Sequence, residues 1–329
     1  MSIDPSRRAL LMMAATWAAG PVLAQPPAWP NRPIRILVGT VAGSSTDGVA
    51  RLYGQKLSEL LGVPVIIDNK PGAANLMAVR ALQAAQPDGY TLYAAVGSAL
   101  AQGPAFRKDL GYEPLKDFSL IAFLGTSPGS IYVHAGVPIT SITELVAYAK
   151  ANPGRLSFAS GGFGSAGHLQ AEYFMSRTGT RLLHVPFKSD PDAAREVSTG
   201  RVNVGFGTTR AIVPLVAAGK VRALATTDWK RTPQLPQVPT IAEAGLSGLE
   251  GLAPYSFFGL VGPAQLPAVV VARLGEAINR ISAQPEVLAQ MRDTLLIEPR
   301  DSTPAEFRQF IEKETAKWRE IGKTLELKD

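Results

Sequence analysis

Residues 158–174 read FASGGFGSAGHLQAEYF, and the order of residue types predicts a strand, a glycine turn and a helix. The strand is the apolar run Leu156–Ala159, and Ser165–Ser176 has the composition of a helix. Between them, residues 162–167 fit G-x-G-x-x-G, the pattern that binds the pyrophosphate of a dinucleotide. The stretch therefore indicates an α/β fold, and it raises the question of what the glycine turn binds.

A nucleotide is the first ligand to test against this turn. A dinucleotide site needs an acidic residue about 20 positions further on, at the end of the next strand. Residues 186–188 (Pro-Phe-Lys) occupy that place, and Asp190 follows only in the next loop. The glycines also have P-loop spacing, but His168 and Leu169 stand where Lys and Ser/Thr are required. We therefore expect no nucleotide and no other cofactor.

Catalytic and metal-binding patterns are also missing from the sequence. The three histidines are His134, His168 and His184, and none is spaced with another His, Asp or Glu as in a metal cluster. Neither Ser45 nor Ser165 lies in a G-x-S-x-G nucleophile elbow. We expect no metal and no catalytic residue. A Ser/His/Asp triad assembled from distant segments, as in an exported hydrolase, stays open as the competing class.

A helix start offers a simpler chemistry, because its free backbone N–H groups and dipole suit an anion. The chain has this arrangement twice, since residues 35–48, RILVGTVAGSSTDG, also read as strand, glycine/serine turn and helix. Two such turns in an α/β fold predict a ligand in the cleft between them. Taken singly, Ser45 or Asp47 also fits a helix cap, and His168 also fits a residue that only holds its loop.

Short β-branched runs alternate with helical patterns from Ile34 onward, as in parallel α/β folds. Helix starts are predicted at Ser141, Thr240 and Thr303, because Glu follows each hydroxyl three residues later as in a capping box. The predicted strands are 34–38, 65–68, 91–96, 120–123, 131–134, 156–159, 183–185, 202–206, 222–226 and 257–261, and the closing helices are 267–282, 285–295 and 304–322.

Two stretches rich in Gly, Ser and Pro, 125–130 and 233–254, have the composition of crossings between domains rather than of helices or strands. The block between them has its own alternation of strands and helices. We therefore expect a discontinuous first domain, residues 25–125 and 250–329, and a second domain, residues 126–249, that includes the crossings.

The first 24 residues predict an export signal. Arg7 and Arg8 precede an apolar run, Ala9–Gly20, whose 12 residues are too few for a bilayer core of roughly 30 Å. A small residue, Ala24, ends the segment, so we expect cleavage after Ala24 and a periplasmic protein. Residues 6–11 also resemble a twin-arginine signal.

The composition is that of a globular protein, with 46% hydrophobic and 18% charged residues among 329. The absence of cysteine excludes disulfides and thiol chemistry. The net charge is +6, and it is +5 without Asp4, Arg7 and Arg8 of the signal. No Lys/Arg cluster indicates nucleic acid, whereas a mildly basic surface suits a small anion.

A set of short motifs is spread over essentially the whole mature chain. The motifs are residues 28–34 (AWPNRPI), 42–47 (AGSSTD), 68–73 (DNKPGA), 87–92 (PDGYTL), 116–118 (KDF), 159–160 (AS), 164–165 (GS), 168–169 (HL), 184–188 (HVPFK), 218–225 (AGKVRALA), 235–245 (LPQVPTIAEAG) and 303–307 (TPAEF). Together they resemble the Bug family, the TctC-like periplasmic substrate-binding components of tripartite tricarboxylate transporters.

The resemblance implies a type II periplasmic-binding-protein fold, in which two α/β domains close on a ligand in the cleft between them. It also implies a small organic acid as ligand, the membrane permease subunits of a tripartite tricarboxylate transporter as partners, and a monomer that is not an enzyme. A ligand-sensing receptor for a membrane sensor kinase is the alternative, because it would use the same closing fold.

By the same resemblance, the first-domain turn binds one carboxylate through backbone N–H groups and hydroxyls, and loops of the second domain face the other end of the ligand. The ligand-binding residues so predicted are Ala42, Gly43, Ser44, Ser45, Thr46, Asp47, Ser98, Phe163, Gly164, Ser165, Ala166, His168, Lys188, Asp190, Gly207 and Thr208.

Two departures from the family pattern concern the second domain. Residues 189–193 read SDPDA where the family usually has glycines and Ala-Pro-Ala, and Gly207 stands where the family often has Asp. Carboxylates at this place would repel an anion. We therefore expect a ligand with one carboxylate at the first-domain turn and a neutral or amino-bearing end near Asp190. The alternative is that Asp190 is a solvated N-cap.

Overall fold

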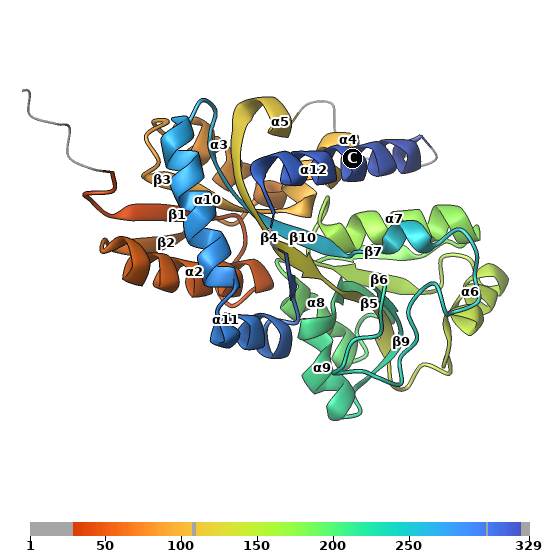
Figure 1. Ribbon diagram of the computed structural model, residues 1–329. Helices are drawn as coiled ribbons and strands as arrows, with labels where there is room; N and C mark the ends of the chain where they lie inside the picture. The colour runs from red at the N-terminus through yellow and green to blue at the C-terminus, as the bar shows by residue number, and fades with distance from the viewer. Residues whose placement is uncertain (1–28, 107–109, 301, 324–329) are drawn as a thin grey trace, which may run out of the picture.

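The computed structural model describes residues 29–106, 110–300 and 302–323, which form two β-sheets with helices around them (Figure 1). The first sheet has the order β11-β4-β10-β3-β1-β2, and the second has the order β7-β6-β8-β5-β9. The strands are β1 (Ile34–Val38), β2 (Val65–Asn69), β3 (Thr91–Val96), β4 (Phe118–Ser127), β5 (Gly129–His134), β6 (Ser157–Ser160), β7 (Leu183–Pro186), β8 (Val204–Thr208), β9 (Val221–Thr227), β10 (Ser256–Pro263) and β11 (Glu298–Pro299). The predicted α/β fold class is confirmed.

Each sheet contains a parallel part that is joined to antiparallel strands. β1 pairs in parallel with β2 and β3, and β6 pairs in parallel with β7 and β8. β10 runs antiparallel to β3 and β4, and β5 runs antiparallel to β8 and β9. Helices cover both sheets, which explains why β3 and β10 are almost continuously buried and apolar.

The helices follow the predicted alternation. In and around the first sheet they are α2 (Ser45–Leu61), α3 (Leu76–Gln83), α4 (Gly103–Phe106), α5 (Pro114–Asp117), α10 (Ala268–Ser282), α11 (Pro285–Ala289) and α12 (Pro304–Gly322), and around the second sheet they are α6 (Ile142–Ala151), α7 (Ala166–Thr178), α8 (Asp190–Ser198) and α9 (Thr209–Ala217). Short turns η1 (Ala73–Asn75), η2 (Ser98–Gln102), η3 (Glu250–Leu252) and η4 (Gln290–Thr294) complete them.

The first crossing between the sheets differs from the prediction, because it is made of strands. β4 continues to Ser127, and β5 begins at Gly129, so that Pro128 alone separates a strand of the first sheet from a strand of the second. Glycine is required beside it, since a Cβ on Gly129 would lie 2.2 Å from the ring of Tyr255.

The second crossing contains turns and η3, and the helix predicted from Thr240 is absent. The capping box that predicted this helix is nevertheless present, because Thr240 N–H donates to Glu243 (2.8 Å) and Glu243 N–H donates to the Thr240 hydroxyl (3.3 Å). Gly245 then takes a left-handed conformation (φ 77°) and ends the turn. A capping box therefore formed without a helix behind it.

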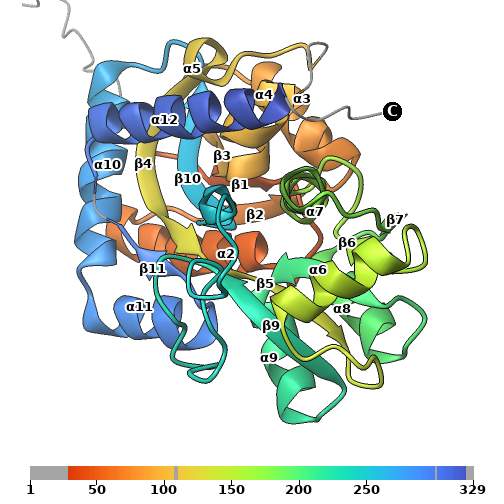
Figure 2. The same ribbon diagram turned by 90° about the vertical axis from the view of Figure 1, so that its right-hand side faces the viewer.

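Helix α12 packs on the cores of both sheets. Phe307 and Ile311 belong to the apolar core of the first sheet, whereas Trp318 is fully buried in the core of the second. Figure 2 shows the helix lying across the upper part of the molecule from α10 to α4. None of the helices in the described residues combines the length and the apolarity that a membrane-spanning helix requires.

We predict that Phe307→Ala lowers the free energy of unfolding by about 3–5 kcal/mol. The ring is fully buried and lies parallel to Phe123, with centroids 5.3 Å apart, over Gly259, where a Cβ would lie 2.2 Å from it. Urea unfolding measures the loss. Gln309→Ala on the exposed face of α12 should change the same quantity by less than about 0.5 kcal/mol. Equal effects of the two substitutions would contradict this packing.

Candidate functional site

A cavity of about 1140 Å³ lies between the two sheets. Its walls come from loops of both, and four helices, α2, α7, α8 and α9, begin at it. Helix starts carry partial positive charge and backbone N–H groups without intrahelical acceptors, so their convergence makes this cavity favourable for an anion.

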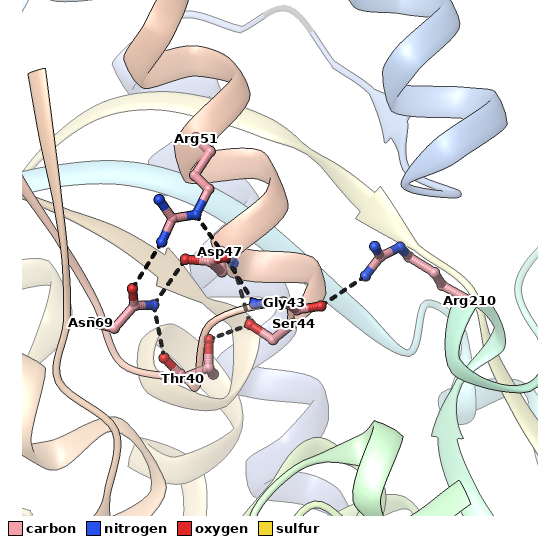
Figure 3. A network of polar contacts seen from close by, with 7 residues as sticks. All are labelled: Thr40, Gly43, Ser44, Asp47, Arg51, Asn69 and Arg210. Atoms are coloured by element: carbon pink, nitrogen blue, oxygen red, sulfur yellow. Dashed lines mark hydrogen bonds and ion pairs between the residues drawn. The ribbon is translucent and has the colours of Figure 1, made fainter. Parts of the chain in front are cut away.

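The start of α2 is organised by hydrogen bonds of its N-cap, Ser44, and of Asp47 in its first turn (Figure 3). The Ser44 hydroxyl accepts from Asp47 N–H (3.2 Å), and an Asp47 oxygen accepts from Gly43 N–H (2.9 Å). Thr40 Oγ1 lies 2.7 Å from Ser44 Oγ. These bonds leave the N–H groups of Ser45 and Thr46 without an acceptor among the described residues, and both residues line the cavity.

Asp47 holds this turn from behind rather than from the cavity. It is 3% exposed, and it accepts hydrogen bonds from Arg51 Nε (2.9 Å) and Asn69 Nδ2 (2.9 Å) as well as from Gly43. Burial alone would raise the pKa of Asp47, but the hydrogen bonds from Arg51, Gly43 and Asn69 outweigh burial and lower it. Asp47 is therefore ionised in the folded protein and fixes the turn electrostatically.

The start of α7 has a related arrangement. The Ser165 hydroxyl accepts from His168 N–H (3.3 Å), and His168 Nδ1 accepts from Gly164 N–H (3.1 Å). Gly167 N–H bonds to the Tyr255 hydroxyl. Ala166 N–H is left without an acceptor among the described residues, and Ala166 lines the cavity.

His168 and His184 stack beneath this turn, with ring centroids 4.3 Å apart. Burial lowers the pKa of each imidazole to about 4, and for His168 the neighbouring His184 contributes to the shift. Both rings are therefore neutral at pH 7. Nδ1 of His168 can consequently act as the acceptor for Gly164.

Ser160 Oγ lies 2.7 Å from His184 Nε2, which is the kind of pair that a hydrolase would need. Ser160 is fully buried, and neither residue lines the cavity. The same hydroxyl accepts from Gly162 N–H (3.3 Å). This Ser–His pair therefore supports the glycine turn from behind the cavity wall.

Asp190 lines the cavity, and its carboxyl group is held by the protein itself. One oxygen accepts from Thr208 N–H (2.9 Å) and from the Tyr255 hydroxyl (3.0 Å), and Gly161 N–H also bonds to the group. Burial raises the pKa of Asp190, and these bonds lower it only in part. The N-cap of α8 is Ser189, so the alternative of Asp190 as N-cap was wrong.

The predicted site residues fall into two groups. The cavity is lined by Ser44, Ser45, Thr46, Ser98, Phe163, Ser165, Ala166, Lys188, Asp190 and Thr208. The remaining predicted residues stand outside its lining, in the same turns or behind them: Ala42, Gly43, Asp47, Gly164, His168 and Gly207. Several of the second group hold the first in place, as Asp47 and His168 do.

Sequence reasoning missed a third loop of the cavity wall, residues 72–75. Ala73, Ala74 and Asn75 have positive φ angles of 46°, 51° and 76°. Leu296, also in the wall, has φ 53°. Non-glycine residues in this conformation are strained, and such strain gathers at ligand sites. Apart from its glycine, the sequence of residues 71–75 (PGAAN) does not indicate these positive φ angles.

Arg210 was also missed, and it bridges the two sides of the cavity. From α9 it donates to the carbonyl oxygens of Gly43 (3.1 Å) and Thr294 (3.3 Å), as Figure 3 shows for Gly43. A second contact brings Ala74 of the first side against the α7 turn, where a Cβ on Gly164 would lie 3.4 Å from it. Within the described ranges, no three His, Asp or Glu side chains gather as metal ligands.

Known proteins resemble this chain in both sequence and fold. Residues 49–327 match the family described as tripartite tricarboxylate transporter family receptor. The chain is 36% identical over 283 residues to a UPF0065 protein of Bordetella bronchiseptica. This alignment covers 86% of this chain and 83% of that protein.

Two solved structures resemble the fold closely. One is the Rhodopseudomonas palustris protein Rpa4515 with adipate, at 31% identity and a TM-score of 0.84, covering 90% of this chain and 98% of that one. The other is the periplasmic binding protein BugD, at 30% identity and a TM-score of 0.82, with the same coverage.

We predict that Asp47→Ala lowers the free energy of unfolding at pH 7 by about 1–3 kcal/mol, because buried donors lose their acceptor. The pKa of Asp47 is lower in the folded than in the unfolded protein, so its contribution is complete above about pH 4 and is lost as the pH falls through the folded pKa. Urea unfolding at pH 7 and at pH 3 measures the difference.

Asp68→Ala is the matched control, because Asp68 makes only partly exposed ion pairs with Arg35 and Lys70. Its effect at pH 7 should stay below about 1 kcal/mol. The role of Asp47 is refuted if the two alanine variants are equally stable at pH 7.

We also predict that acidification from pH 6.5 to pH 4 destabilises the protein through His168 and His184. The unfolded chain takes up protons on both imidazoles below about pH 6.5, whereas the folded chain does so only near pH 4, so stability falls with pH across this window. Unfolding free energies measured across it should fall less steeply for His184→Gln. A wild-type slope in His184→Gln would count against the assignment.

Proposed function

Because this chain belongs to the tripartite tricarboxylate transporter family of receptors, we propose that it captures a small carboxylate-bearing metabolite in the cavity between its sheets and delivers it to the membrane permease subunits of such a transporter. The family consists of periplasmic solute-binding proteins. Its members bind small carboxylates, as Rpa4515 does with adipate.

The observation that carries the proposal is the set of free N–H groups in the cavity wall. Ser45 and Thr46 present two at the start of α2, and Ala166 presents one at the start of α7. Ser44 and Ser165 already cap the third N–H of each helix, those of Asp47 and His168, through their hydroxyls. A carboxylate oxygen supplies the acceptors that these groups lack, and it also gains from the helix dipoles.

Asp190 explains why the carboxylate should bind at α2 rather than at α8 or α9. Its own carboxyl group lies at the starts of both helices, where it accepts from Thr208 N–H, and it would repel an anionic ligand placed there. The backbone N–H groups of Thr208 and Gly161 and the hydroxyls of Tyr255 and Thr208 contact this carboxyl group, and a second anionic group beside it would be repelled. We therefore keep, as part of the proposal, a neutral or amino-bearing ligand end near Asp190.

The proposed transport role further requires that two domains move and that the protein is exported. We propose that the units built on the two sheets, residues 25–125 with 250–329 and residues 126–249, close on the ligand as a monomer, with Arg210 contacting Gly43 in the closed state. The proposed cleavage after Ala24, which would release the protein into the periplasm, lies outside the described residues.

We predict that Ser45→Pro lowers the affinity for the carboxylate ligand by about 10- to 150-fold, because it removes one charge-assisted hydrogen bond. Proline fits the first position of a helix, and Ser44 before it already has the extended backbone (φ −66°, ψ 167°) that proline requires. A thermal-shift screen of mono-, di- and tricarboxylates, amino acids and aromatic acids identifies the ligand, since a concentration of about 100 Kd adds about 2.7 kcal/mol. Calorimetric titration then measures Kd.

Ser45→Ala is the control, because it removes the hydroxyl but keeps the backbone N–H. Its affinity should lie much closer to wild type than that of Ser45→Pro. If Ser45→Pro binds as tightly as Ser45→Ala, the carboxylate is not held by this N–H group. If no organic acid shifts the unfolding temperature of the wild type, the proposed function itself is wrong.

A further inference from the structure

Four aromatic rings form a continuous series of contacts from the core of the second sheet to the cavity. We call Phe158, His184, His168 and Phe163 the four-ring stack. Neighbouring centroids lie 4.7 Å, 4.3 Å and 4.6 Å apart, and the rings of the last pair, His168 and Phe163, are inclined by 35°. Phe158 is fully buried, and His168 is 3% exposed. The stack therefore anchors Phe163 on rigid core residues.

Phe163 itself is unusually exposed for a large apolar side chain. It is 43% exposed, and it lines the cavity. Its backbone is fixed on both sides by glycines with left-handed φ angles, Gly162 (115°) and Gly164 (72°), and Gly164 N–H is bonded to His168. The turn thus presents a phenyl ring to the cavity in a defined orientation, and no described side chain covers the remainder of the ring.

The rest of the cavity suits a ligand with an apolar body. Its wall includes Val41, Val96, Phe187, Val213, Phe258 and Leu296. Its volume of about 1140 Å³ is above the usual range of about 300–1,000 Å³ for pockets that enclose drug-sized ligands. A short aliphatic acid would satisfy the N–H groups of Ser45 and Thr46 but would leave most of the apolar wall and Phe163 in contact with water, which is unfavourable.

We propose that the ligand carries an aromatic ring that stacks on the exposed part of Phe163 while its carboxylate binds at the start of α2. This inference rests on the proposed function and narrows its ligand class to aromatic carboxylates. A ring placed there becomes the fifth member of the series, in the offset or tilted geometry that aromatic pairs prefer. A saturated ring of the same size gains the apolar contact but not the ring–ring interaction.

The experiment compares two matched pairs of acids by calorimetric titration of the purified protein. Benzoate is paired with cyclohexanecarboxylate, and phenylacetate with cyclohexylacetate, so that charge and size are nearly constant within each pair. The wild type should bind at least one aromatic acid about three- to tenfold more tightly than its saturated partner, and more tightly than adipate. In Phe163→Leu, which keeps an apolar side chain, the aromatic preference should fall to near one.

Phe187→Leu is the control, since Phe187 lines the same cavity but packs on the apolar cluster around Tyr132 and Ala159 instead of on the four-ring stack. This variant should keep the aromatic preference of the wild type. Thermal unfolding of both variants checks that they fold. We expect Phe163→Leu to fold, because the Phe163 side chain is largely exposed.

Three results would overturn the inference. They are a wild-type preference for the saturated acids or for adipate, an unchanged aromatic preference in Phe163→Leu, and an equal loss of it in Phe187→Leu. In each of these cases a carboxylate still binds, so the proposed function stands. If none of the five acids and none of the other organic acids of the screen binds, the proposed function fails together with the inference.

Discussion

The N–H groups at the start of an α-helix have no acceptor within the helix, and the site is built on this constraint. Helices α2, α7, α8 and α9 all begin at one cavity, so their unsatisfied donors gather in one place. The chain supplies some of the missing acceptors itself, through Ser44, Ser165 and Asp190. The N–H groups of Ser45 and Thr46 are among those left unsatisfied, and we propose that an anion binds there.

The same constraint explains why the carboxylate in the first turn of α2, that of Asp47, stands behind the cavity wall. A carboxylate in the wall would compete with an anionic ligand, whereas Asp47 lies on the far side of the turn and is neutralised by Arg51. It orients the N–H groups without repelling what they bind. Asp190 does face the cavity, but it lies at the starts of α8 and α9 and accepts from Thr208 N–H, so repulsion of an anion there is our reason for proposing α2 as the anion site.

A feature of this structure can be predicted from the sequence when the residues that produce it lie close together in the chain. Strands and most helix starts were predictable, because caps such as Thr303 with Glu306 form within four residues. The capping box at Thr240 predicted a helix that is absent, because Gly245 ends the turn that follows it. The positive φ angles of residues 73–75 and the reach of Arg210 to Gly43 depend on contacts distant in sequence, and no local pattern encodes them.

The glycine pattern of residues 162–167 shows why a motif and its usual ligand can separate. Gly162 and Gly164 have left-handed φ angles, as a tight turn needs, and a Cβ on Gly167 would lie 2.3 Å from the carbonyl oxygen of Phe206 in β8. These are the requirements of packing a helix closely behind a strand, and a dinucleotide fold shares them. The pattern therefore reports the geometry of the turn. The residues to which we assign ligand contacts, Phe163 and Ala166, stand at positions that the pattern leaves open.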